Sequence, residues 1–95
     1  MASSISSGLK NADAAIFAGR NRINAITVLS DGTNNATLVV YDNPSAASGT
    51  ELAKVVCKGA DLMQHIIFEN PVVAQDGIYA DVTGTGATFI VFYGG

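Results

Sequence analysis

Residues that favour turns recur along this sequence at the spacing of roughly 8–12 residues that is typical of β-sandwiches and barrels. Glycine, asparagine and aspartate mark most of these turns, and the runs between them are short and rich in valine, isoleucine, threonine and aromatic residues. Such runs favour strands over helices. We therefore predict an all-β fold, a single small antiparallel β-sandwich or jelly-roll-like barrel of about 6–8 strands.

The predicted strands lie between these turns. The main runs cover residues 22–30, 36–41, 51–58, 63–69, 77–83 and 87–93, with a weaker additional strand over residues 14–19. Asn70-Pro71 is predicted as a turn, so neither proline is expected inside a strand. A helix is the alternative prediction for three segments, residues 14–18, 51–58 and 61–66. The β-branched pair Val55-Val56 favours a strand in the second of these segments.

The last predicted strand is apolar on both of its faces. One face carries Thr88, Ile90 and Phe92, and the other carries Ala87, Phe89, Val91 and Tyr93. A half-solvated strand alternates between apolar and polar residues, whereas a strand covered on both sides does not. A chain this short cannot form three layers, so we expect a neighbouring subunit to cover the second face. The alternative is that the N-terminal arm and the long loops lie over it.

The length of 95 residues predicts one domain. We expect a flexible or extended arm over residues 1–13 and a β-sandwich domain over residues 14–95. A domain of this size buries only roughly 60–65% of its unfolded surface, which leaves its stability marginal. Cys57 is the sole cysteine and His65 the sole histidine, so neither an internal disulfide nor a zinc site is expected. Oligomerisation is therefore the predicted source of additional stability.

Charge is sparse in this sequence. Charged residues make up 14% of the chain, against roughly a quarter in typical proteins, which favours a surface partly covered by another subunit. The net charge is −3, and the basic residues form no stripe that would follow a nucleic acid backbone. No apolar run is long enough for a membrane span, and the N-terminus lacks a signal-peptide pattern. We expect synthesis in a reducing cytoplasm and no nucleic acid or membrane partner.

No set of residues predicts an enzyme. His65 is expected in mid-strand without a nucleophile beside it, and a catalytic role for it is the weakest hypothesis. Cys57 lies in an apolar run between Lys54 and Lys58, which favours a buried and inert thiol. The acidic residues are spread singly, mostly at turns, rather than paired as a glycosidase requires.

Cofactor and ligand motifs are equally weak. The loop that begins with Asp31-Gly32 offers oxygen ligands, and with Asp42 or Asp81 it is a calcium candidate, but its spacing does not match an EF-hand. The Gly84-Thr85-Gly86 segment lacks the lysine of a phosphate-binding loop and predicts a tight hairpin. We therefore predict no cofactor and no metal. The tyrosines are candidates for a sugar-binding platform, although core and interface packing is the default prediction: Tyr41, Tyr79 and Tyr93.

The order of several segments resembles small β-rich virion structural proteins of tailed bacteriophages, of the head decoration or cement type. The resemblance covers roughly residues 19–95 and is carried by strand and turn segments. These are Gly19-Arg20 before a strand, Asp31-Gly32-Thr33 followed by ATLVVYD, residues 45–52, Asp76-Gly77-Ile78-Tyr79 with Asp81-Val82-Thr83-Gly84, and the terminal FIVFYGG. No functional residue is carried over from the family.

The resemblance implies a non-enzymatic protein on the capsid surface of the virion, made in the host cytoplasm. It implies a homo-oligomer, with a trimer favoured, that contacts the major capsid protein or another virion protein and stabilises the head. The alternatives are a tail or head–tail accessory protein and a carbohydrate-binding module displayed on the particle. The interface candidates are Ile5, Leu9, Phe17, Phe89, Val91 and Tyr93.

Overall fold

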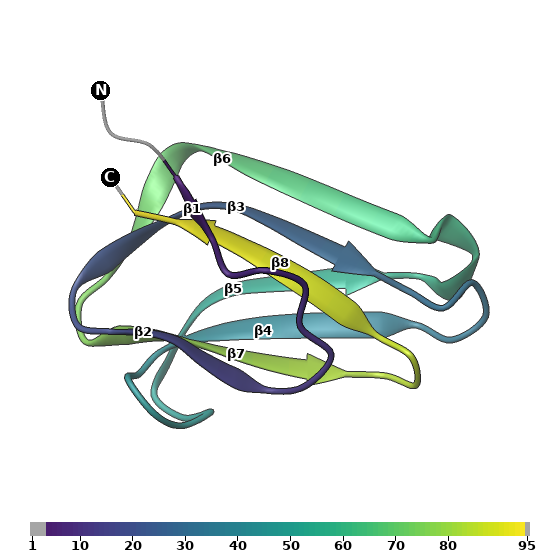
Figure 1. Ribbon diagram of the computed structural model, residues 1–95, viewed down its shortest axis with the longest axis horizontal. Coiled ribbons are helices and arrows are strands. Elements are labelled where there is room, and N and C mark those ends of the chain that lie inside the picture. Colours follow the sequence, from purple (N-terminus) through teal and green to yellow (C-terminus); the bar gives the residue numbers. More distant parts are fainter. Residues whose placement is uncertain (1–3, 95) are drawn as a thin grey trace.

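The computed structural model describes residues 4–94, which form two antiparallel sheets packed face to face (Figure 1). Sheet A has the strand order β1-β8-β3-β6, and sheet B has the order β2-β7-β4-β5. The elements of this region are β1 (Ile5–Ser6), β2 (Ala14–Ala18), β3 (Asn21–Leu29), β4 (Ala36–Asp42), β5 (Thr50–Cys57), the 3-10 helix η1 (Gly59–Asp61), β6 (Met63–Ala74), β7 (Gly77–Thr83) and β8 (Thr88–Tyr93). The predicted all-β sandwich is confirmed, and neither sheet closes into a barrel.

The core fills the space between the sheets. Strand β8 shows how alternation builds it, because Phe89 and Val91 are fully buried while Ile90 and Phe92 between and beside them are only half-buried. Burying an aliphatic or aromatic side chain of this size stabilises the fold by about 1.5–3 kcal/mol. The remaining strands contribute the rest of the core: Ile23, Ile26, Val28, Ala36, Leu38, Val40, Val55, Cys57, Ala74, Ile78, Ala80 and Ala87. Cys57 is a free, buried thiol, as its apolar run predicted.

Strand β6 is longer than the sequence predicted. It continues through Asn70 and Pro71 to Ala74, so the prediction that no proline lies inside a strand was wrong for Pro71. The pairing with β3 jumps from Ala25–Ile67 to Ile23–Val72, which leaves residues 68–71 as a bulge. Because β6 is an edge strand and Pro71 lies in this bulge, its missing N–H costs no ladder hydrogen bond.

The helical alternatives for residues 14–18 and 51–58 are also wrong, because both segments form strands. The third alternative, residues 61–66, overlaps η1 only at Asp61 and otherwise leads into β6. In residues 4–94 no helix is long and apolar enough to cross a membrane. Each predicted main strand other than β6 agrees with the structure to within a residue or so at its ends.

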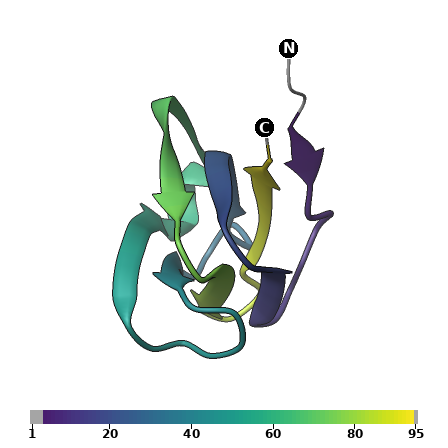
Figure 2. The same cartoon turned by 90° about the vertical axis from the view of Figure 1, so that its left-hand side faces the viewer.

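The N-terminal arm lies along the edge of sheet A. Strand β1 pairs with the end of β8, and Lys10 exchanges two backbone hydrogen bonds of 2.9 Å with Phe89. Ser7 N donates to Val91 O at 2.9 Å, and Ser7 Oγ accepts from Val91 N at 2.9 Å. The arm therefore continues the sheet beyond β8, as Figure 2 shows, rather than covering the outer face.

The sandwich has two open sides, which Figure 2 shows end-on. At one side the edge strands are β5 and β6, which lie at the left in that view, and at the other they are β1 and β2, which lie at the right. We call these the β5/β6 side and the β1/β2 side. The strands of residues 4–94 therefore present four surfaces to a partner, namely these two sides and the outer faces of the two sheets.

Candidate interaction surfaces

The outer face of sheet A is largely apolar, with Thr27, Thr88 and His65 among its apolar residues. Strand β3 contributes Ala25, Thr27 and Leu29, which stand opposite Phe92, Ile90 and Thr88 of β8. On its other flank β3 pairs with β6, which adds Met63, His65 and Ile67. Met63 is 54% exposed and Ile67 is 72% exposed. The structure thus assigns the two apolar faces of residues 87–93, one to the core and the other to the molecular surface.

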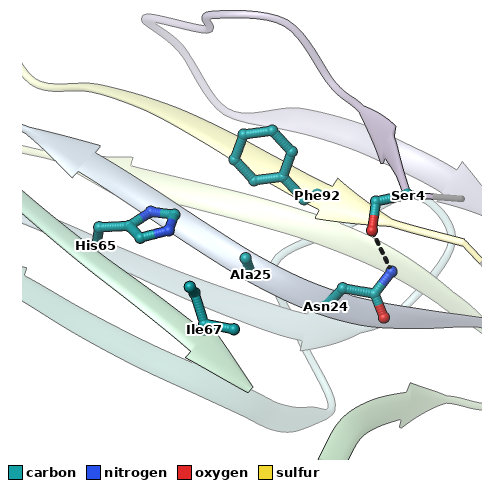
Figure 3. Close-up of a pocket in the computed structure, with 6 residues that line it drawn as sticks. All are labelled: Ser4, Asn24, Ala25, His65, Ile67 and Phe92. Carbon is teal, nitrogen blue, oxygen red and sulfur yellow. Dashed lines mark hydrogen bonds between the residues drawn. The ribbon is translucent and has the colours of Figure 1, made fainter. Parts of the chain in front are cut away.

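A shallow hollow indents this outer face (Figure 3). Its floor is Ala25, whose short side chain lies between the larger Phe92 of β8 and Ile67 of β6. At one end Asn24 Nδ2 donates to Ser4 Oγ at 2.8 Å and to Gly94 O at 3.1 Å. The hollow is mostly apolar and offers a fit for a protruding apolar side chain of a partner.

His65 lies at the other end of the hollow. Its Nδ1 is 2.6 Å from Thr27 Oγ1, and its ring meets Phe92 edge-on at a centroid separation of 6.4 Å. Thr27 is 9% exposed, so its hydroxyl is largely sheltered by the sheet. Within residues 4–94 no carboxylate is bonded to this histidine, and a nucleophile–base pair needs such an orienting group.

Four of the predicted interface residues lie on the β1/β2 side. Ile5 is the register partner of Tyr93, and the Tyr93 ring contacts Phe17 of β2 at a centroid separation of 5.9 Å. Ile5 and Phe17 remain 53% and 38% exposed, and Leu9, in the connection between β1 and β2, is 64% exposed. The fold therefore brings Ile5, Phe17 and Tyr93 together and leaves their apolar surface open to a partner.

The other two candidates, Phe89 and Val91, are in the core. Both are fully buried between the sheets. A partner cannot reach them without opening the sandwich, so the structure corrects their assignment as interface residues. The residues of β8 that face outward are Ile90 and Phe92, and the sequence could not distinguish the two faces because both are apolar.

The β5/β6 side carries exposed apolar residues that the sequence did not single out. They are Val56 at 48%, Leu62 at 59%, Met63 at 54% and Ile67 at 72% exposure. The signal that was available is Pro71, because a proline in a strand marks an edge. That signal was lost when Asn70-Pro71 was predicted as a turn.

The outer face of sheet B is more polar. Tyr41 and Tyr79 are cross-strand partners on it and are both half-buried. Burial, followed by the charges of Glu51 and Asp81, raises the pKa of Tyr41. Burial, together with a hydrogen bond and the negative charge of Asp13, raises the pKa of Asp81. This face therefore combines two aromatic rings with an acidic pair.

The calcium candidates do not converge. Asp31 accepts hydrogen bonds from the backbone N of Thr33 and Asn34 at 2.9 and 2.7 Å, which lower the pKa of its carboxyl. Asp42 accepts from the N–H groups of the turn after β6, and Asp81 lies beside Asp13. In residues 4–94 no group of three or more histidine, cysteine or acidic residues is placed to hold a metal ion.

Comparisons with models of protein families, with curated proteins and with solved structures found no match for this chain.

Proposed function

We propose that this protein is a non-enzymatic structural component of a bacteriophage virion that decorates or cements the capsid as a homo-oligomer, with a trimer favoured. The observation that carries the proposal is the apolar outer face of sheet A. A small soluble domain rarely exposes a continuous apolar face unless a partner covers it. The resemblance noted in the sequence supplies the class of partner, which is the major capsid protein or another virion protein.

The outer face meets the requirements of a docking surface. Its centre is apolar, with Ile90 and Phe92 on β8 and the hollow over Ala25 beside them. At its margin lie two polar side chains, Asn24 and Ser4, which are hydrogen-bonded to each other. An apolar centre with a polar rim is the usual anatomy of a specific interface. The exposed Ile5 and Phe17 extend the apolar surface around the β1/β2 side.

The proposal is tested by rebinding the purified protein to capsids that have been stripped of it. Phe92→Asp is expected to fold and to lose binding by about tenfold or more, because burying an unpaired charge in an interface costs several kcal/mol. The control is Thr37→Asp, which places the same charge at a half-buried position on the outer face of sheet B. If Phe92→Asp rebinds as well as Thr37→Asp, the outer face of sheet A is not the docking surface.

Phe89→Asp is the inner-face counterpart on the same strand. It places a charge in the core, where the loss of packing and the burial of the carboxylate cost about 4 kcal/mol or more. We expect loss of the folded circular dichroism spectrum, in contrast to Phe92→Asp. A folded Phe89→Asp variant would contradict the assignment of the two faces.

A carbohydrate-binding module on the particle surface is the second candidate. The observation that favours it is the cross-strand pair of Tyr41 and Tyr79 on the outer face of sheet B. Glycan-array binding that is lost in Tyr79→Ala and retained in Phe92→Asp would support it. Absence of glycan binding by the folded protein would remove it.

A further inference from the structure

We propose that copies of this chain associate through the β5/β6 side, with the edge of β6 in one copy pairing with the edge of β5 in the next. The inference deepens the self-association that the proposed function includes, by naming the surface and its partner strand. It is carried by three independent features of that side, namely open backbone groups, exposed apolar residues and complementary charges.

The edge of β6 has open hydrogen-bonding groups. Ser30 N donates to Leu62 O at 2.8 Å, which fixes the phase of the ladder between β3 and β6. Bonded and non-bonded positions alternate along an antiparallel pair, so the even-numbered residues up to Ile66 direct their backbone groups to β3. The odd-numbered residues direct their N–H and C=O groups to the open edge: Met63, His65 and Ile67.

The edge of β5 is open in the same way. Val82 N on β7 points toward β2, where Asp13 accepts its hydrogen bond at 2.8 Å. The same alternation carried across β7 and β4 pairs Leu38 with Val55 by hydrogen bonds. The neighbours of Val55 then direct their backbone groups to the open edge: Lys54 and Val56.

Each edge also presents exposed side chains. On β5, Lys54 and Val56 are exposed on the outer face of sheet B, and on β6, Met63 and Ile67 are exposed on the outer face of sheet A. Long regular edges with exposed apolar residues pair readily with another strand, and natural monomers usually protect them with charges, bulges or prolines. Here the bulge and Pro71 protect only the distal part of β6, and a second bulge at Leu52 interrupts only the beginning of β5.

The charged side chains near the two edges favour pairing of β6 with β5 over pairing of β6 with a second β6. Exposed Lys54 and Lys58 mark the β5 edge, and exposed Asp61 and Glu69 bracket the open segment of β6. Among the residues that the structure describes, none of these four side chains makes an ion pair or hydrogen bond. An antiparallel β6–β6 contact centred on His65 brings Asp61 toward Glu69 of the second copy. A β6–β5 contact instead brings acidic residues toward lysines.

The geometry of the sandwich allows this contact to repeat. Strand β5 ends and β6 begins at the same end of the molecule, joined by η1, and the two strands run in opposite directions (Figure 1). A rotation of one copy about an axis parallel to the strands leaves each residue at the same position along that axis, so β6 of one copy can lie antiparallel to β5 of the other. Ser30 Oγ donates to Gly59 O and Ser30 N donates to Leu62 O, so the residues that follow β5 lie level with the start of β6. We therefore place Val56 of one copy opposite His65 of the other, with Lys58 near the Asp61 end and Lys54 near the Glu69 end. The same contact closes a ring of two or three copies.

Light scattering of variants with altered charges tests the pairing. The wild-type protein is expected to show a mass of two or three times the 9.7 kDa of one chain. The double variant Lys54→Glu/Lys58→Glu faces like charges on β6 and should associate about tenfold or more weakly. Adding Asp61→Lys/Glu69→Lys to the same chain restores opposite charges and should restore the mass. Lys10→Glu/Arg20→Glu is the matched control, with the same change in net charge at Lys10 beside β8 and at Arg20, which lies in the turn between β2 and β3 and donates to Gln75 Oε1.

Three results of this experiment overturn the inference. One is a monomeric wild-type protein, and another is a Lys54→Glu/Lys58→Glu variant that associates like the Lys10→Glu/Arg20→Glu control. The third is a quadruple variant that folds and remains monomeric. All the substituted positions of the β5/β6 side are exposed, so the variants are expected to keep the wild-type circular dichroism spectrum.

Disulfide cross-linking tests the partner strands directly. Val56→Cys and His65→Cys are made separately with Cys57→Ala, so that each chain has a single thiol. Mild oxidation of the mixture should yield a cross-linked pair that contains one chain of each kind. His65→Cys alone should remain uncross-linked. Efficient self-cross-linking of His65→Cys indicates β6–β6 pairing and refutes the proposed contact, as does a mixture that yields no cross-link.

These tests fail separately from those of the proposed function. The charge and cross-linking experiments use the purified protein in solution, whereas rebinding to stripped capsids uses Phe92→Asp and Thr37→Asp. A protein that rebinds capsids but is unaffected by Lys54→Glu/Lys58→Glu keeps the proposed function and loses the edge pairing. A protein that pairs through β5 and β6 but never binds capsids keeps the edge pairing and loses the proposed function.

Discussion

Both open sides of the sandwich expose large apolar side chains, but the backbone beside those side chains differs between the two sides. On the β1/β2 side the arm occupies the edge of β8 through Ser7 and Lys10, and β1 itself is only a short strand. What remains for a partner is mainly side chains, Ile5 and Phe17 among them. On the β5/β6 side the strands are longer, and Met63 exposes its backbone groups together with its side chain.

The difference teaches that the same kind of exposed residue serves two kinds of contact. An apolar cluster beside short edge strands, as on the β1/β2 side, fits a dissimilar partner surface through side-chain packing. An apolar residue on an open edge fits another strand, because backbone hydrogen bonds give the affinity and side chains set the register. In the proposed function, side-chain packing of the first kind joins the protein to the particle, and strand pairing of the second kind joins its copies.

Among substitutions outside the hydrophobic core, we expect the strongest destabilisation in the turn that follows β6. Asp42 accepts hydrogen bonds from the backbone N of Asp76, Gln75 and Gly77 at 2.7, 3.0 and 3.3 Å, and so anchors the end of β6 to sheet B. Asp42→Ala is expected to lower the free energy of unfolding by about 3 kcal/mol in chemical denaturation, since bonds to a charged acceptor are each worth about 1.5–3 kcal/mol. Asp76→Ala removes the same charge from the turn and should have little effect.

The contribution of Asp42 also depends on pH. The N–H of Asp76 is the main cause that holds the pKa of this carboxyl below its ordinary value of 3.8, with those of Gln75 and Gly77 adding to it. A lowered pKa means that the stabilisation is present above the ordinary value and is lost as the pH falls through the folded value. The difference between Asp42→Ala and the wild type should therefore shrink in acid. A difference that grows in acid would contradict this assignment.

The N-terminal arm covers the edge of β8, so releasing the arm should expose the backbone groups of that edge. Lys10→Pro removes the N–H that donates to Phe89 O, and it should lower the free energy of unfolding by about 2 kcal/mol. Hydrogen exchange at the amides of Phe89 and Val91 should quicken, because their acceptors lie on the arm. Lys10→Ala keeps the backbone donor and is the control. Unchanged protection in Lys10→Pro would mean that the arm does not close this edge.

The smallest effect is expected from the acidic pair next to β2. Burial raises the pKa of Asp81, as do the hydrogen bond and charge of Asp13, so this carboxyl favours the folded state when it is protonated. Its stabilisation is present at low pH and is lost as the pH rises through the folded pKa. Asp81→Asn should therefore stabilise the protein at neutral pH by up to about 1 kcal/mol. A loss of stability there would contradict repulsion between the carboxylates.

The sequence predicted the strands well because their signals are local. Residues 77–83 alternate regularly between turns, and this strand has the bounds that were predicted. The end of β6 was missed because proline is excluded from paired positions but tolerated in an edge bulge. Whether β6 lies at an edge depends on the strand order, which no local signal specifies.

The candidate surfaces were only partly predictable. Ile5 and Leu9 stood out as the apolar residues of a polar N-terminal segment, and both are exposed, as is Phe17 in the next apolar run. Phe89 and Phe92 were indistinguishable because both faces of their strand are apolar. Only the position of sheet B, which packs on one face of β8, separates the core residue from the surface residue.

In the proposed function this protein acts through its surfaces, with the outer face of sheet A against a capsid. Cryo-electron microscopy of the purified parent virions tests it most directly. We expect density for the sandwich on the head, with Ile90 and Phe92 facing the capsid and neighbouring copies joined from β6 to β5. Virions without this protein, copies confined to the tail, or an outer face of sheet A left open to solvent would contradict it.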